Sequence, residues 1–288
     1  MNIKDLQYYV AVAELEHFGQ AAERCFVSQP TLSGQIKKLE EQLGVTLLER
    51  TNRRVMLTET GEEIANVARR ILREVDVIKD IAHSHRDPLS GKFRLGAFPT
   101  LASYIFPSVV PKIKAAMPNL KLILIEEKTA DLVDKLRNGE IDAALLALPI
   151  YDDFLVASKL FDDDFLLAVP SGHSLCQHTV IEQEMLREYS LLLLDEGHCL
   201  RDQALDVCQS QMIGHELDFK ATSLETLRQM IKAGTGITLM PKISIDDNED
   251  DIHFIPFSAP SPSRSIGLVW RKTSARKKVV NQLMSMFN

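Results

Sequence analysis

The sequence predicts an α-helical winged helix-turn-helix domain over residues 1–58, a linker helix over 59–87 and an α/β domain over 88–288. Three observations support this prediction. Short amphipathic helix patterns and a basic hairpin fill the first part of the chain. A heptad spacing of apolar residues follows. The rest alternates strand-like and helix-like apolar runs, a pattern typical of α/β domains.

The composition is that of an ordinary soluble protein, with 45% hydrophobic and 25% charged residues. No apolar stretch is long enough to span a bilayer, and the N-terminus lacks an apolar signal core. We therefore expect a cytoplasmic protein with no membrane partner. Four cysteines are too few for a disulfide scaffold, and a reducing compartment favours a transient redox bridge over a permanent one.

The net charge of −7 is unevenly distributed. Residues 24–54 contain six Lys or Arg against three Glu, so this region carries 6 − 3 = +3. A local basic surplus is the pattern expected of a domain that contacts nucleic acid, while the acidic surplus lies further along the chain.

The third helix pattern of the N-terminal domain is the expected DNA-recognition helix. Ser28 is a suitable N-cap, Pro30 fits the first turn, and Gly44 fits the position just after the helix. Apolar residues at helical spacing face inward, and polar residues followed by lysines face outward, which suits entry into the major groove. The residues expected to contact DNA, in this helix and in the wing, are Ser28, Gln29, Pro30, Thr31, Ser33, Gln35, Lys37, Arg50 and Arg53.

The wing is expected over residues 46–58, where two short strands flank a polar, basic tip. Its arginines can reach phosphates or an adjacent minor groove. The alternative is a small helical packing unit with an incidentally basic edge, because helix-turn-helix patterns also arise by chance.

The linker helix begins near Thr60, which fits a capping box, or at Thr58. Its apolar residues step by four and three, which is a heptad seam typical of a two-helix dimer. A dimer would present two winged helices to a two-fold operator. The alternative is a helix that lies on the core of its own domain. The seam residues are Ile64, Ala68, Ile71, Val75, Ile78 and Ala82.

The α/β domain is predicted to contain mostly parallel sheets in two subdomains, with a cleft between them. Subdomain I covers about 88–161 and 267–288, and subdomain II about 162–266, with crossing strands near 155–161 and near 266. Strands are expected at 93–97, 120–125, 141–147, 165–169, 191–194, 217–221, 237–239, 252–257 and 266–270, and helices at 103–116, 131–138, 224–233 and 275–286.

Two cysteines, Cys199 and Cys208, lie nine positions apart on a predicted helix over residues 200–208. That separation spans roughly 13 Å along a helix axis, whereas a disulfide tolerates Cα atoms up to about 7 Å apart. The pair can bond only if the segment refolds, so it is a candidate switch. Cys199 lies at the expected helix N-terminus beside Arg201, and both features favour its thiolate. The alternative is that both are small buried apolar residues.

Several motifs together resemble the LysR-type transcriptional regulators. In the N-terminal domain these are Ala21-Ala22, Val27-Ser28-Gln29-Pro30, Leu32-Ser33, Leu43-Gly44, Leu48-Glu49-Arg50 and Leu57-Thr58. Gly19 departs from the family, where many members carry a polar or basic residue, so no DNA contact is expected there. In the second half, Gly197-His198-Cys199-Leu200-Arg201-Asp202 resembles the sensor segment of the peroxide-responsive members, and Thr222-Ser223-Leu224-Glu225-Thr226-Leu227-Arg228 adds to the likeness.

This resemblance implies a periplasmic-binding-protein-like effector domain and a role for each matching residue. Cys199 would attack hydrogen peroxide and become a sulfenic acid, and Cys208 would resolve it to a reversible disulfide. The implied partners are double-stranded operator DNA, hydrogen peroxide, further copies of the chain in a tetramer, RNA polymerase and a cellular thiol reductant. No cofactor or metal is implied. The residues around peroxide would be Thr100, Thr129, His198, Asp202 and Arg264.

Two other functions compete with this interpretation. One is a LysR-type regulator that binds a small metabolite in the cleft, with inert cysteines. The other is a thiol peroxidase that turns over, which the DNA-binding unit disfavours. Cys25 and Cys176 are expected to be structural.

Overall fold

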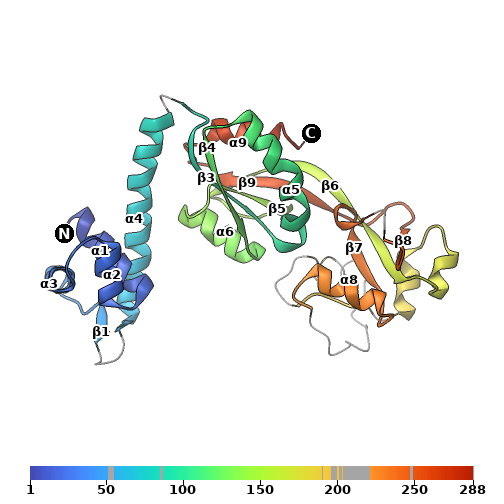
Figure 1. Ribbon diagram of the computed structural model, residues 1–288, viewed down its shortest axis with the longest axis horizontal. Helices are drawn as coiled ribbons and strands as arrows, with labels where there is room; N and C mark the ends of the chain where they lie inside the picture. The colour runs from blue at the N-terminus through green and yellow to red at the C-terminus, as the bar shows by residue number, and fades with distance from the viewer. Residues whose placement is uncertain are drawn as a thin grey trace. The chain divides into compact units, whose positions relative to one another are not determined.

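The computed structural model describes residues 1–50, 55–84, 87–189, 191–195, 200, 203, 221–246 and 249–287. The chain divides into two compact units, Met1–His85 and Arg86–Asn288. Each is built around cores of its own. Figure 1 shows the helices of the first unit and the sheet of the second.

The first unit is a helical bundle with a two-stranded wing. Its core packs Leu6, Tyr9 and Val12 of the first helix against Leu32 and Ile36 of the third. The described elements are α1 (Ile3–Leu15), α2 (Phe18–Arg24), α3 (Gln29–Leu43), β1 (Leu48–Arg50), β2 (Val55–Leu57) and α4 (Glu59–Ser84).

The boundaries of α3 agree with those predicted from its capping residues. The Ser28 side chain accepts a hydrogen bond from the N–H of Thr31, and Pro30 lies in the first turn. Gly44 ends the helix with a positive φ of 70°, which glycine adopts without steric cost. The apolar residues at helical spacing in α3 were expected to face inward, but Leu43, the last residue of the helix, is 37% exposed.

The linker helix α4 begins after Thr58, which was the second of the two predicted starts, and not at Thr60. The Thr58 hydroxyl accepts from the N–H of Gly61 at 2.9 Å, which satisfies a first-turn donor. The Tyr9 hydroxyl donates to the carbonyl of Gly61 at 2.6 Å and fixes α1 to this turn. Ala65 and Ala68 are buried in the same core, so the start of the predicted seam packs against its own domain.

The second unit contains a seven-stranded mixed sheet in the order β4-β3-β5-β9-β6-β7, with β8 beside β6. Among the named strands of this sheet, β3–β4 and β3–β5 are parallel and the other four pairs are antiparallel, so the prediction of mostly parallel sheets is wrong for these strands. Apolar periodicity does not encode strand direction, and the two crossing strands impose antiparallel pairing. The strands are β3 (Gly91–Ala97), β4 (Leu120–Glu126), β5 (Ala143–Leu148), β6 (Leu155–Pro170), β7 (Thr238–Pro241), β8 (Ile252–Pro256) and β9 (Ser263–Arg271).

Strands β6 and β9 run from one subdomain into the other and pair from Leu155–Arg271 to Asp164–Ser263 (Figure 1). One apolar core lies in subdomain I and two lie in subdomain II. A side chain at Gly267 would place its Cβ 2.9 Å from the carbonyl oxygen of Ser158, so the close pairing of the crossing strands requires glycine there.

Helix α5 begins four residues before its predicted start at residue 103, because Pro99 supplies a preformed first turn. Predicted strand 191–194 reduces to isolated bridges of Leu191 and Leu194, and residues 217–220 lie outside the described chain. Of predicted helix 200–208, Leu200 and Gln203 are described, and both are helical. No helix among the described residues is long and apolar enough to cross a membrane. The helices are α5 (Pro99–Ala116), α6 (Thr129–Asn138), α8 (Leu224–Lys232), α9 (Lys277–Met284), and the 3₁₀ helices η1 (Ser174–Gln177), η2 (Gln183–Glu188) and η3 (Lys242–Ser244).

Candidate functional site

Two threonines lie at matching positions beyond the carboxyl edge of the parallel strands. Ala97 of β3 pairs with Glu126 of β4, and each strand leads into a helix. Thr100 lies three positions after Ala97, in the first turn of α5. Thr129 lies three positions after Glu126, in the first turn of α6. The carboxyl edge of parallel strands is where open α/β sheets bind ligands, and helix N-termini there favour electron-rich groups.

Arg264 brings the crossing strand β9 to Thr100. Its Nη1 donates to the Thr100 hydroxyl at 2.9 Å, and its Nη2 donates to the Thr100 carbonyl at 3.2 Å. Arg264 is 2% exposed and Thr100 is 3% exposed, so both contacts are shielded from solvent. The structure therefore joins two residues of the predicted peroxide group that are 164 positions apart in the chain.

Asp163, which was not predicted from the sequence, neutralises the buried guanidinium. Its Oδ2 accepts from Nε of Arg264 at 3.0 Å and lies 2.8 Å from Nη2. Asp163 and Arg264 are register partners on β6 and β9. The run of aspartates at 162–164 gave no hint of this, because acidic runs are usually solvated. In the sequence, the one clue is that Asp163 lies two positions before the predicted apolar strand at 165–169.

Aromatic rings enclose the same guanidinium. The Arg264 Cζ lies 5.2 Å from the ring centroid of Phe98 and 5.9 Å from that of Phe165. Both distances allow cation–π attraction. The arginine is thus held by charge, hydrogen bonds and ring contacts together.

The Thr129 hydroxyl is buried and has no hydrogen-bond partner among the described residues. An unpaired buried hydroxyl is costly and is a position where an unseen partner is expected. Because the Thr100 hydroxyl accepts from Arg264, its own proton remains available to a ligand. The two hydroxyls and the guanidinium can hold a small polar molecule and stabilise negative charge that develops on it.

The remaining predicted sensor residues, His198, Cys199, Asp202 and Cys208, lie outside the described residues. Leu200 is buried in a core that includes Leu194. Of the two described cysteines, Cys25 packs against the core of the first unit, and burial raises the pKa of its thiol. The Cys176 thiol lies 3.5 Å from the carbonyl of Pro170. Both residues are half-buried.

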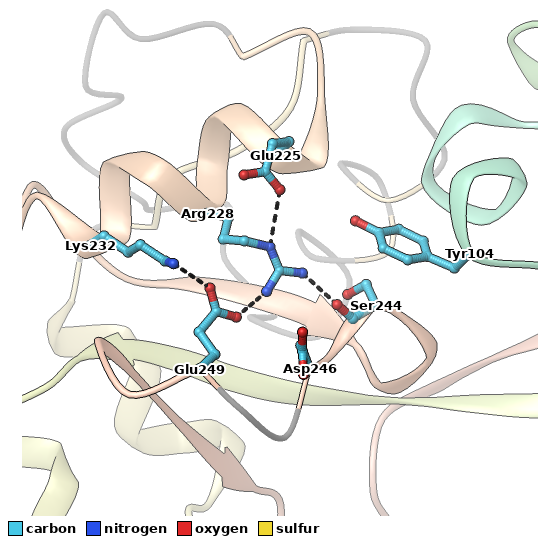
Figure 2. Close-up of a pocket in the computed structure, with 7 residues that line it drawn as sticks. All are labelled: Tyr104, Glu225, Arg228, Lys232, Ser244, Asp246 and Glu249. Carbon is cyan, nitrogen blue, oxygen red and sulfur yellow. Dashed lines mark hydrogen bonds and ion pairs between the residues drawn. The ribbon is translucent and has the colours of Figure 1, made fainter.

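A polar pocket of about 320 Å³ lies beside α8 (Figure 2). Arg228 pairs with Glu249 and donates to the carbonyl of Ser244, and Lys232 pairs with Glu249 at 2.9 Å. Burial lowers the pKa of Arg228, but Tyr104 and Glu249 outweigh it, so the net shift is upward. No group of metal-ligating residues occurs among the described side chains.

Most of the predicted DNA-contacting residues lie at the N-cap and in the N-terminal half of α3. Ser28, Gln29, Pro30 and Thr31 are exposed, Ser33 and Gln35 are half-buried, and Lys37 is exposed one turn further along. The Ser28 hydroxyl is committed to the helix cap. Arg50 lies on β1, and Arg53 lies outside the described residues.

Comparison with known proteins agrees with this two-part architecture. Residues 3–62 match the family model for bacterial regulatory helix-turn-helix proteins of the lysR family, and residues 86–288 match the LysR substrate binding domain. The transcriptional dual regulator OxyR of Escherichia coli K12 is 42% identical over 285 residues, which cover 98% of this chain and 93% of that protein.

Solved structures of OxyR proteins are similar over almost the whole chain. A full-length OxyR variant from Pseudomonas aeruginosa matches with a TM-score of 0.81 at 37% identity and covers 100% of this chain and 94% of that one. A hydrogen-peroxide-bound OxyR mutant from Corynebacterium glutamicum matches with a TM-score of 0.68 at 33% identity and covers 99% and 91%. The protein therefore belongs to the LysR family of bacterial helix-turn-helix regulators.

Proposed function

We propose that this protein is a DNA-binding transcriptional regulator that senses hydrogen peroxide through a reversible Cys199–Cys208 disulfide. The observation that carries the proposal is the buried Arg264–Thr100 pair at the carboxyl edge of the sheet, with the unpartnered Thr129 hydroxyl at the matching position. The relatives named hydrogen peroxide-inducible genes activators, and the peroxide-bound relative, support it.

In the proposed reaction the Cys199 thiolate attacks one oxygen of hydrogen peroxide. An S–O bond forms as the O–O bond breaks, sulfur loses two electrons, and the departing hydroxide takes a proton to become water. The Thr100 and Thr129 hydroxyls and the Arg264 guanidinium hold peroxide and stabilise the developing negative charge. His198 and Asp202 complete this group of peroxide-binding side chains.

The Cys208 thiol then attacks the sulfur of the Cys199 sulfenic acid. A disulfide forms and water leaves. A cellular dithiol restores both thiols by disulfide exchange, taking up the oxidising equivalents. On the helix predicted for residues 200–208 the two cysteines would be too far apart to bond. The proposed disulfide therefore requires the segment to refold, and that change is the proposed output.

The output reaches DNA through the assembly of several copies. Residues 1–58 bind operator DNA, residues 59–87 dimerise, and residues 88–288 sense peroxide. Along α4 the later seam residues Ile71 and Ile78 are 39% and 67% exposed, which supports a second copy as their partner. Two dimers would form the tetramer, and RNA polymerase would be the partner at the promoter. The protein would act in the cytoplasm and as a stoichiometric sensor, not as an enzyme.

Peptide mass mapping after a stoichiometric pulse of hydrogen peroxide tests the proposal, with free thiols blocked at each time point. The expected product is a Cys199–Cys208 disulfide within seconds, which a reductant reverses. Cys199→Ser should abolish it, while Cys176→Ser is the control that leaves it unchanged. Four free thiols after the pulse would contradict the proposal and favour a metabolite-responsive regulator. Continuous peroxide consumption in the presence of reductant would favour a peroxidase.

A further inference from the structure

We propose that Asp163 is the positioning residue of the sensor: it holds Arg264 against Thr100 in the geometry that receives peroxide. The inference rests on the proposed function. It adds a residue that would never touch peroxide and would act through Arg264.

The first argument is that the two carboxylate oxygens of Asp163 accept hydrogen bonds from two different segments. Oδ2 of Asp163 accepts from Nε of Arg264 at 3.0 Å, and Oδ1 accepts from the N–H of Ile243 at 3.0 Å. Asp163 is 4% exposed, so water cannot replace either contact. The side chain is thereby fixed at both ends of its carboxylate.

The second argument is that the turn bonded to Asp163 is itself held by hydrogen bonds. Ile243 lies in the short helix η3, whose Ser244 carbonyl accepts from the buried Arg228 (Figure 2). The Ser244 hydroxyl also donates to the carbonyl of Pro241 at 2.7 Å. Asp163 therefore binds a turn that Arg228 of α8 also holds, through the Ser244 carbonyl.

The third argument is that each nitrogen of the Arg264 guanidinium has a defined set of partners. Nε faces Asp163, Nη2 is shared between Asp163 and the Thr100 carbonyl, and Nη1 reaches the Thr100 hydroxyl. Nη1 carries two N–H groups and has one acceptor among the described residues. The edge of the guanidinium opposite Asp163 is thus the edge left for a ligand, and Asp163 determines where it points.

Only a carboxylate satisfies both neighbours, because both of its oxygens accept. In Asp163→Asn one end of the side chain is an NH₂ group, which faces the N–H of either Ile243 or Arg264. Either arrangement sets two donors against each other and displaces the guanidinium. A misplacement of about 1 Å at a reacting group can cost up to roughly 100-fold in rate.

The test compares two reactions of Cys199 in the full-length protein, both followed by peptide mass mapping across pH. One is oxidation by hydrogen peroxide, and the other is alkylation by iodoacetamide, which involves no peroxide oxygen. At the high-pH limit, where the thiol is fully ionised, Asp163→Asn should slow oxidation about 10- to 100-fold and leave alkylation within about 2-fold. Asp162→Asn is the control, since the exposed Asp162 pairs with Lys159 and Ser265 and should change neither rate.

A second set of variants separates positioning from folding. Arg264→Gln leaves Asp163 as a buried carboxylate without its cation, so it should lower both the melting temperature and the oxidation rate. The double variant with Asp163→Asn should regain melting temperature but not oxidation rate, because Asp163 acts only through Arg264. Asp163→Glu keeps both accepting oxygens and should oxidise faster than Asp163→Asn.

An equal fall of oxidation and alkylation in Asp163→Asn would assign the residue a structural role and overturn the inference. An unchanged oxidation rate in that variant would also overturn it, while the proposed function would stand. A wild-type protein whose Cys199 is not oxidised by stoichiometric peroxide would overturn both.

Discussion

Arg264 and Thr100 are joined by a 2.9 Å hydrogen bond from Nη1 to the threonine hydroxyl, and this bond links β9 to the first turn of α5. Because the hydroxyl oxygen accepts from Arg264, its proton is free to be donated to another partner. In the proposed function that partner is peroxide, so the threonine relays the alignment of the arginine to the ligand.

Thr100→Val should therefore impair peroxide sensing more than it impairs folding. Valine has a similar shape but cannot accept from Arg264 or donate to peroxide. We expect the rate of Cys199 oxidation to fall roughly 100-fold, the cost of losing one donor at a developing charge. Rapid mixing with peroxide, quenching by a thiol-trapping reagent and mass spectrometry would measure this oxidation rate. Ser103→Ala, at an exposed position of the same helix, should keep the wild-type rate.

The sequence predicted elements best where local chemistry fixes them. The Ser28 cap, Pro30 and Gly44 define α3 within a few residues, whatever the rest of the chain does. Contacts between distant segments could not be predicted in this way. The buried partner of Arg264 is Asp163, which the sequence places in an acidic run, and only the register of β6 against β9 brings the two together.

The predicted peroxide-binding residues show the same difference between local position, which the sequence predicts, and long-range contact, which it does not. Thr100 and Thr129 could be placed near helix starts from their positions after strands. That the threonines share one sheet edge depends on the parallel pairing of β3 with β4. The ion pair of Arg228 with Glu249 depends on a loop folding back onto α8, and no spacing rule predicts such a contact.

Lys37→Ala should weaken DNA binding equally for all sequences. Lys37 is exposed on α3, and its pair with Glu41 is long at 3.9 Å, so its charge is available to a phosphate. Losing one phosphate contact should reduce the slope of log K against log salt by about 1. Fluorescence anisotropy at several salt concentrations would measure it. Lys278→Ala, an exposed lysine on α9, should leave the slope unchanged.

Gly61→Ala should destabilise the packing of α4 on the wing. A Cβ at Gly61 would collide with the carbonyl oxygen of Leu47, which is backbone and cannot move aside. We expect a loss of about 1–3 kcal/mol in the free energy of local opening, the usual cost of overpacking. Hydrogen exchange of α1 peptides in the full-length protein would report it.

The matched variant Gly34→Ala should have the opposite effect on the same measurement. Apart from its two chain neighbours and the nearby backbone of its own helix, no heavy atom lies within 4 Å of the position that a Cβ would take at Gly34. Alanine within a helix is favoured over glycine by roughly 0.5–1 kcal/mol. Equal protection in the two variants would show that the Leu47 carbonyl exerts no constraint.

Ile78→Asp should convert the assembly to monomers if α4 is the dimerisation element. Ile78 is 67% exposed, and a carboxylate there would be buried against the partner helix on association. Sedimentation velocity would detect the change. Arg70→Asp places the same charge on an exposed position of α4 outside the seam and should keep the wild-type distribution. Dimers that persist in Ile78→Asp would exclude this part of the seam from the interface.

Two aspartates of the second unit should respond to pH with opposite signs. Burial raises the pKa of Asp142, although the N–H of Arg94 opposes it. Its contribution to stability is therefore present below the unfolded pKa and lost as pH rises through the raised value. Burial also acts on Asp152, but Arg137 and the N–H of Phe154 outweigh it and lower the pKa. The contribution of Asp152 is present above its unfolded pKa and lost as pH falls.

Urea unfolding at pH 3 and pH 7, followed by the fluorescence of the single tryptophan, Trp270, would test these signs. Asp142→Asn keeps an acceptor for the N–H of Arg94 and removes the charge, so its free energy of unfolding relative to wild type should be higher at pH 7 than at pH 3. Asp152→Asn loses its ion pair with Arg137, so its relative stability should be lower at pH 7 than at pH 3. The same pH trend in both variants would contradict the assignment, because only opposite shifts of the two carboxyl groups produce opposite slopes.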